Sequence, residues 1–194
     1  RICYWPIDDC KRNNSYYYIN WKVSNHMSTL SVDTIQGQTT AANVKLPAGC
    51  ILQVVQGELL TQASNSSSSY SDLLSQAITP KYNNSKILIQ CNGCGTPQTA
   101  NALYFKLLRG STEIGSGTGG GYYNVISALT NPGNGEQFDV KGWTIQFLDS
   151  PATTSATTYK IQSAAVNGTA KIGGRQDNTD IAVPTRMTLM EISV

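Results

Sequence analysis

After residue 50, short apolar runs are separated by turn-forming residues, and several of the runs alternate apolar and polar side chains. The segment 143–147 shows this best, because Trp143, Ile145 and Phe147 share one face and Thr and Gln occupy the other. A two-residue period is that of a β-strand with one buried face. Strands are predicted over residues 51–60, 70–78, 86–91, 103–108, 122–129, 143–147, 159–166, 169–172 and 187–194. No long helical period appears.

The turn sequences predict how neighbouring strands connect. Gly110-Ser111 fits a type II′ hairpin, because glycine suits the first central position. Asn167-Gly168 is the strongest hairpin signal and predicts that the strands on either side of it pair directly. Many short antiparallel strands with such turns are typical of a β-sandwich or jelly roll. We therefore expect an all-β antiparallel sandwich or jelly roll, with a short extended N-terminal arm.

Composition and charge exclude several classes of function. Only 13% of the residues are charged and the formal net charge is +2, so the clustered positive charge that nucleic-acid binding requires is missing. One His and 12 acidic residues supply few general acids or bases. No apolar run is long enough for a membrane-spanning helix. We expect no enzyme, no nucleic-acid partner and no membrane insertion.

The pair Cys91 and Cys94 forms a C-x-x-C motif at the expected end of the strand 86–91, where Asn92-Gly93 signals a turn. A structural zinc site needs four ligands, and outside the first 26 residues only Cys50 is left as a third one. A redox pair would sit at a helix N-terminus, which is not expected here. We interpret the two as small, partly buried thiols, with a disulfide to Cys50 as the open alternative.

Two other motifs resemble ligand-binding sequences only in part. Residues 115–120 match G-x-G-x-x-G, but a strand-like sequence follows where a phosphate site needs a helix. We interpret this segment as a surface loop. Residues 177–180 offer side-chain oxygens to calcium but lack the rest of an EF-hand loop, so a solvated turn is expected. Neither a metal nor a cofactor is predicted.

The first 26 residues differ from the rest, since they hold two of the three Trp and the only His and show no strand or helix period. Codons for Trp-Lys-Val at 21–23 can contain GGAAGG, a ribosome-binding-like sequence shortly before Met27. We expect translation to start at Met27 and residues 1–26 to be untranslated leader, the alternative being a genuine atypical extension. Residues 27–49 have few large apolar side chains and are expected to form an arm that needs a partner surface. Residues 50–194 are then the head domain.

Several short motifs follow one another along the chain, the most distinctive being the pair 147–155 and 158–162. They occupy residues 27–36, 52–56, 78–80, 85–89, 108–112, 147–155, 158–162 and 188–192. In this order they resemble tail-fibre-like virion proteins of marine bacteriophages, including those of cyanobacteria. The resemblance covers essentially residues 27–194 and leaves the first 26 outside. The cysteines at 91 and 94 and the shortness of the arm depart from it.

The resemblance implies a structural virion protein of fibre or knob type that is made in the host cytoplasm and located in the extracellular particle. It implies a homotrimer, contacts with other virion proteins through residues 27–49, and attachment to the host surface. The alternatives are a capsid decoration or head-fibre protein without receptor binding and, third, a glycan depolymerase. The resemblance supplies no catalytic residue.

A host-surface glycan is the expected ligand if one loop makes contact. Tyrosine rings can stack on apolar sugar faces, and the glycines before them let the loop adapt. We therefore predict the binding residues Tyr122, Tyr123 and Asn124, within or beside the Gly-rich loop 115–123. The alternative is that the two tyrosines begin a strand, one buried and one exposed.

Overall fold

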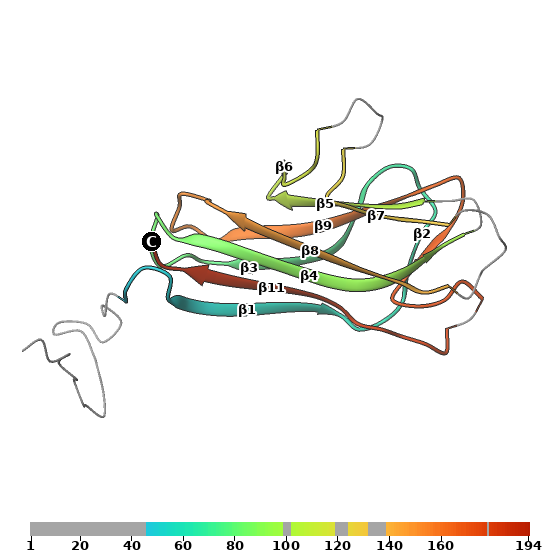
Figure 1. Cartoon of the computed structure of the whole chain (residues 1–194), viewed down its shortest axis with the longest axis horizontal. Coiled ribbons are helices and arrows are strands. Elements are labelled where there is room, and N and C mark those ends of the chain that lie inside the picture. Colours follow the sequence, from blue (N-terminus) through green and yellow to red (C-terminus); the bar gives the residue numbers. More distant parts are fainter. Residues whose placement is uncertain (1–45, 99–101, 119–123, 132–138, 178) are drawn as a thin grey trace, which may run out of the picture. The chain divides into compact units, whose positions relative to one another are not determined.

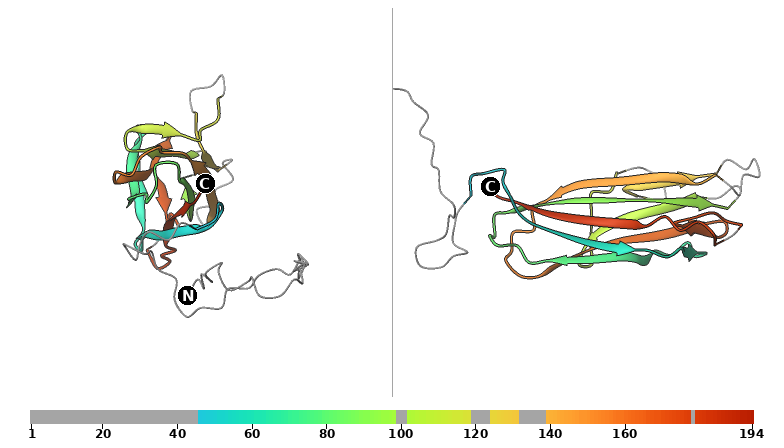
Figure 2. Two further views of the ribbon diagram at one scale, coloured as in Figure 1. Left: turned by 90° about the vertical axis from the view of Figure 1, so that its left-hand side faces the viewer. Right: turned by 90° about the horizontal axis from the view of Figure 1, so that it is seen from below.

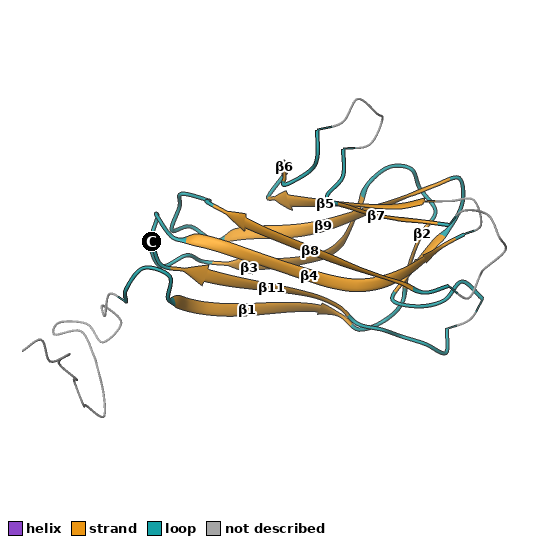
Figure 3. Cartoon of the chain, viewed as in Figure 1, coloured by secondary structure: helices purple, strands orange, loops and turns teal. Residues whose placement is uncertain are grey.

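The computed structural model describes residues 46–98, 102–118, 124–131, 139–177 and 179–194. All of them belong to one unit of the chain, Lys45–Val194, and every regular element among them is a β-strand (Figure 3). Their bounds are β1 Ile51–Leu59, β2 Ala63–Asn65, β3 Ser71–Ile78, β4 Lys86–Pro97, β5 Ala102–Arg109, β6 Thr112–Ile114, β7 Ser127–Thr130, β8 Lys141–Asp149, β9 Thr157–Val166, β10 Ala170–Ile172 and β11 Thr185–Ile192. No helix that could cross a membrane occurs in the described ranges.

Sheet A contains β1, β2, β4, β8, β10 and β11, and all of its pairings are antiparallel. The long β4 pairs on one side with β8 and on the other with β11 and then β10. β1 pairs with β11, and β2 pairs with β10, so both lie beyond these strands. Sheet A is thus four strands wide, in the order β1/β2, β11/β10, β4, β8 (Figure 1).

Sheet B contains β3, β5, β6, β7 and β9. β9 lies between β3 and β5, and both β6 and β7 pair with the far side of β5. Sheet B is therefore also four strands wide. The two sheets face each other as two layers (Figure 2).

The strand order is that of a jelly roll. If β1/β2, β6/β7 and β10/β11 each count as one, the strands number eight along the chain, in the order 1-8-3-6 in sheet A and 2-7-4-5 in sheet B. Every connection except that from β5 to β6/β7 passes from one sheet to the other. The predicted all-β antiparallel sandwich or jelly roll is confirmed.

The core lies between the two sheets and follows from the alternation of side chains. In β4, Ile87, Ile89 and Cys91 point inward and are at most 1% exposed, whereas Gln90 and Asn92 are exposed on the outer face. Residues of β8 and β11 extend this inner face of sheet A, and residues of β5 and β9 in sheet B pack against it with the same alternation. The core comprises Ile78, Ile87, Ile89, Cys91, Leu103, Phe105, Leu107, Leu129, Trp143, Ile145, Tyr159, Ile161, Ala165, Ala170, Ile172, Met187 and Leu189.

The prediction that Asn167-Gly168 joins a hairpin is wrong. Asn167 has φ +64° and Gly168 φ +148°, so the dipeptide does form a turn with left-handed backbone. β9 is already paired on both sides, with β3 and with β5, and no edge is left for the strand that follows. The turn therefore carries the chain across to sheet A, where β10 pairs with β4 and β2.

Two strand boundaries also differ from the sequence prediction. β4 does not end at Asn92-Gly93 but continues to Pro97, because β8 and then β10 supply pairing partners along it. β7 begins at Ser127, and the described residues 124–126 before it do not belong to a strand, so the predicted strand is not continuous over 122–129. The hairpin at Gly110-Ser111 is as predicted: Arg109 pairs with Thr112, and Gly110 has φ +60°.

Candidate functional site

The predicted binding residues belong to the loop between β6 and β7. Tyr122 and Tyr123 lie outside the described residues, so their role and the alternative that they begin a strand both stay predictions. Asn124 is described and exposed. The structure thus places one of the three residues at the surface and does not test whether they act together.

The base of this loop is fixed to the sandwich. The amide of Gly117 donates a hydrogen bond to the carbonyl of Val125 at 3.2 Å, which closes the loop just before it meets sheet B. The amide of Ile126 donates to the carbonyl of Phe105 at 3.0 Å. Its described parts leave the sandwich on the side of β5 and β6 (Figure 1). A loop held in this way is suited to presenting side chains from a rigid scaffold.

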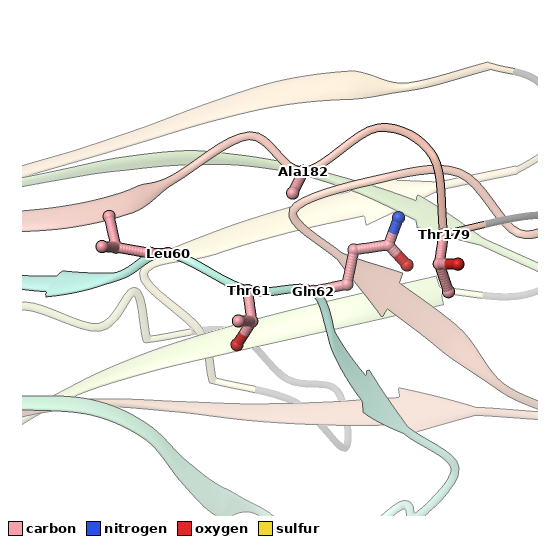
Figure 4. Close-up of a pocket in the computed structure, with 5 residues that line it drawn as sticks. All are labelled: Leu60, Thr61, Gln62, Thr179 and Ala182. Atoms are coloured by element: carbon pink, nitrogen blue, oxygen red, sulfur yellow. The ribbon is translucent and has the colours of Figure 1, made fainter.

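A shallow pocket of about 310 Å³ lies where β1 gives way to β2 (Figure 4). The side chain of Gln62 crosses it, and its Nε2 donates a hydrogen bond to the carbonyl of Ile181 at 2.5 Å. Among the described residues that line the pocket none is charged, so they offer no group for acid–base chemistry. Its lining residues are Leu60, Thr61, Gln62, Thr179 and Ala182.

Sequence reasoning did not find this pocket. It forms because the segment 60–62, between two strands of the same edge, meets the loop 179–182 that leads into β11. The two segments are far apart in the chain, and the motif considered at residues 177–180 does not point to residues 60–62, so only the strand pairing brings them together.

Asp149 is a buried acid that links the two sheets. It ends β8 in sheet A and accepts hydrogen bonds from the Tyr159 hydroxyl at 2.6 Å and from Arg109 Nη1 at 2.9 Å and 3.0 Å, both residues of sheet B. Burial raises the pKa of the Tyr159 phenol, and the Asp149 carboxylate raises it further. The phenol is therefore a hydrogen-bond donor throughout the neutral range and is unsuited to act as a base.

Glu191 is a second buried acid, with no exposed surface. Its Oε1 accepts hydrogen bonds from the amides of Lys81 at 2.7 Å and Tyr82 at 3.3 Å, and its Oε2 accepts one from Gln53 Nε2 at 2.6 Å. These donors satisfy a carboxylate that would otherwise be costly to bury. The group therefore fastens the β3–β4 connection to sheet A.

The cysteines carry no site chemistry. Cys50, Cys91 and Cys94 are all free thiols, so the alternative of a disulfide to Cys50 is not realised. Burial raises the pKa of the Cys91 thiol to about 12 and also raises that of Cys94. The thiolate is the form that binds metals and reacts. Both residues lie within β4 rather than at a strand end, which corrects the sequence prediction.

No group of three or more His, Cys, Asp or Glu side chains that could hold a metal ion occurs among the residues the structure describes. The G-x-G-x-x-G segment is described at Gly115–Thr118, where it forms a loop after β6 rather than a helix start. Neither this described part nor the described residues 124–126 form the helix N-terminus that a phosphate cradle requires.

No protein-family model matches the chain, and no curated protein is similar to it in sequence. Among solved structures, the chain is similar to the crystal structure of the infectious bursal disease virus VP2 subviral particle, with 11% identity and a TM-score of 0.42, and to the structure of the infectious bursal disease virus Gx strain, with 9% and 0.38. The matches cover 85% and 84% of this chain and 42% of each of the other chains, so the chain spans well under half of their length. At such low identity the similarity assigns no function.

Proposed function

We propose that the chain is a structural protein of a bacteriophage virion, of fibre or knob type, whose jelly-roll head takes part in attachment to the host surface. The motif order along residues 27–194, which resembles tail-fibre-like virion proteins, supports the proposal. The topology supports it too, because jelly rolls serve as viral capsid and lectin domains.

The observation that carries the proposal is where the chain enters and leaves the described domain. The amide of Gly49 donates to the carbonyl of Ser193 at 2.8 Å, and the amide of Ser193 donates to the carbonyl of Cys50 at 2.9 Å. The β4–β5 and β9–β10 connections lie at the other end of β4, where the amide of Gln98 donates to the carbonyl of Thr169 at 3.1 Å (Figure 1). A domain attached through its entry end presents the opposite loops outward, whereas the loop between β6 and β7 leaves from the side of the sandwich, beside Leu107–Arg109 of β5.

The buried acids favour display over catalysis. Asp149 and Glu191 are each held by hydrogen-bond donors from the opposite sheet or from a neighbouring connection. Neither lines the pocket at the β1–β2 junction. Acids held by such hydrogen bonds stabilise the scaffold. A passive surface protein needs a rigid scaffold of this kind.

Attachment would combine several weak contacts. The loop between β6 and β7, with Tyr122, Tyr123 and Asn124, is the proposed glycan contact, and residues 27–49 are the proposed contact with other virion proteins. In a homotrimer three such loops act together, which raises the avidity without any new contact.

Immunogold labelling of the phage that encodes the chain tests the proposal. Gold at the tail tip, together with slower phage adsorption in the presence of the purified chain, supports attachment. Gold over the capsid lattice without an effect on adsorption supports the decoration alternative. Absence of gold from intact and from disrupted particles contradicts a virion role.

The glycan contact is tested by the paired substitutions Tyr122→Ala and Tyr123→Ala, which should remove the competition with adsorption. Tyr82→Ala, in the β3–β4 connection, is the control and should compete like the parent protein. Equal competition by all three proteins argues against this loop as the contact.

A further inference from the structure

The outer face of sheet A carries an apolar row that runs across the sheet from β1 through β11 and β4 to β8. Direct cross-strand partners share a face, and the register places Val54 opposite Met190, Met190 opposite Leu88, and Leu88 opposite Leu148. Val54 is 54% exposed and Leu148 47% exposed, while the two central residues are half-buried. We call these four residues the apolar row.

The next row on the same face is uncharged. It consists of Gln56, Thr188, Gln90 and Gln146, again as direct cross-strand partners. A glutamine amide both donates and accepts hydrogen bonds, so a row of this kind can pair with a copy of itself. Beyond it, Glu58 and Arg186 form an ion pair at 2.9 Å.

The outer face of sheet B has the opposite character. Lys160 Nζ lies 2.7 Å from Asp72, and Lys106 Nζ lies 2.6 Å from Glu113. Lys106 also lies over the ring of Tyr70, with 4.5 Å from Nζ to the ring centroid. Charged and ion-paired side chains of this kind are typical of a solvated face. The two outer faces of one domain therefore differ in what they can contact.

We propose that the outer face of sheet A is the surface through which copies of this chain associate, an inference that deepens the proposed virion function and rests on it. A contiguous apolar strip across a whole sheet marks an interaction surface. The partner is a second copy because the face is uncharged at its centre and self-complementary in its amides. Its border carries the ion pair of Glu58 with Arg186 on one side and the single cation Lys86 on the other, which is too little positive charge to recruit a nucleic acid or an anionic membrane.

Light scattering coupled to size exclusion, on the full chain, tests this inference with a matched pair of variants. Leu148→Glu introduces a charge into the apolar row. Leu108→Glu introduces the same charge at a half-buried leucine on the outer face of sheet B, where the register places it opposite Lys160. Circular dichroism shows whether each variant keeps its strand content, and Val54→Glu serves as a second test variant.

We expect the parent protein and Leu108→Glu to have a mass that is a multiple of the single chain. We expect Leu148→Glu and Val54→Glu to fall to the mass of one chain while staying folded. If the parent protein has the mass of one chain at high concentration, the inference is overturned. The same holds if that mass arises because residues 1–45 cover the face. Retention of the oligomer by both test variants overturns it as well.

The light-scattering experiment tests the association surface separately from the virion role, which immunogold labelling tests. A single-chain mass combined with gold on the virion removes only the association surface. A multiple-chain mass that depends on Leu148, without gold on the virion, removes only the virion role.

Discussion

The indole of Trp143 in β8 stacks on the phenyl ring of Phe105 in β5, with ring centroids 4.3 Å apart and ring planes inclined by 30°. The first ring belongs to sheet A and the second to sheet B, so this contact joins the two layers at the core. Both rings are at most 5% exposed. We therefore expect the stack to contribute strongly to the stability of the sandwich.

Phe105→Ala should lower the free energy of unfolding by about 3–5 kcal/mol, because it removes a buried ring and leaves a cavity beside Trp143. Urea denaturation followed by Trp fluorescence measures this loss. Tyr104→Ala, at the neighbouring outward position of β5, is the control and should cost clearly less. Equal losses in the two variants would show that the inter-sheet stack has no special weight.

The hydrogen bond from Tyr159 to Asp149 predicts a second stability effect. Tyr159→Phe removes one donor from a buried carboxylate and should cost about 1–3 kcal/mol. Arg109 still donates to Asp149, so the variant should remain folded. Thermal or urea unfolding of the two proteins at neutral pH measures the difference, and a change near zero contradicts the prediction.

The same hydrogen bond predicts a loss of stability at alkaline pH. Burial, and then Asp149, raise the pKa of Tyr159 in the folded state above its ordinary value. The unfolded chain therefore releases the phenolic proton first, and the contribution of Tyr159 to stability is complete below about pH 10 and falls as the pH rises above it. Unfolding midpoints measured across this range should fall more steeply for the parent protein than for Tyr159→Phe. Parallel pH profiles would rule the linkage out.

The loop between β6 and β7 depends on the absence of a side chain at Gly115. Its φ is +72°, and a Cβ there would lie 2.8 Å from Cδ2 of Phe147. Gly110 has φ +60°, and nothing lies within 4 Å of such a Cβ. Substitution of Gly110 therefore measures the cost of backbone strain without a steric clash. Gly110→Ala should cost about 1–2 kcal/mol, and Gly115→Ala should cost about 1–3 kcal/mol more because of the overpacking. A larger loss in Gly110→Ala would contradict the role of Phe147.

The buried thiols should resist alkylation in the folded protein. Burial raises the pKa of Cys91 to about 12 and that of Cys94 as well, so little thiolate is present at pH 8. After iodoacetamide treatment, peptide mass spectrometry should find both residues unmodified until denaturant is added. The half-buried Cys50 is the internal comparison and should react earlier. Rapid modification of Cys91 in the native protein would contradict its position in the core.

Much of the strand content was predictable from the sequence, because inward positions such as Trp143 and Ile145 alternate with polar neighbours and the sandwich buries one face of each strand. Apart from the hairpin at Gly110-Ser111, local signals did not predict which strands pair. Asn167-Gly168 has the composition of a hairpin turn, yet both edges of β9 are occupied by strands from distant parts of the chain. Long-range pairing overrides the preference of the turn.

The candidate surfaces were harder to find. The pocket at Gln62 has no local signature, since strand register alone brings its two segments together. The apolar row does have a signal in the sequence. Leu88 and Met190 interrupt the alternation at positions where a solvated face would carry polar side chains. Apolar residues on both faces of the same strand indicate that the outer face also has a partner.

Mass spectrometry of density-purified particles tests the virion role most directly. The account predicts that peptides from residues 50–194 are enriched in the particle fraction, with many copies per particle and together with other virion proteins. Peptides that are abundant in the infected-cell lysate but absent from purified particles would contradict it.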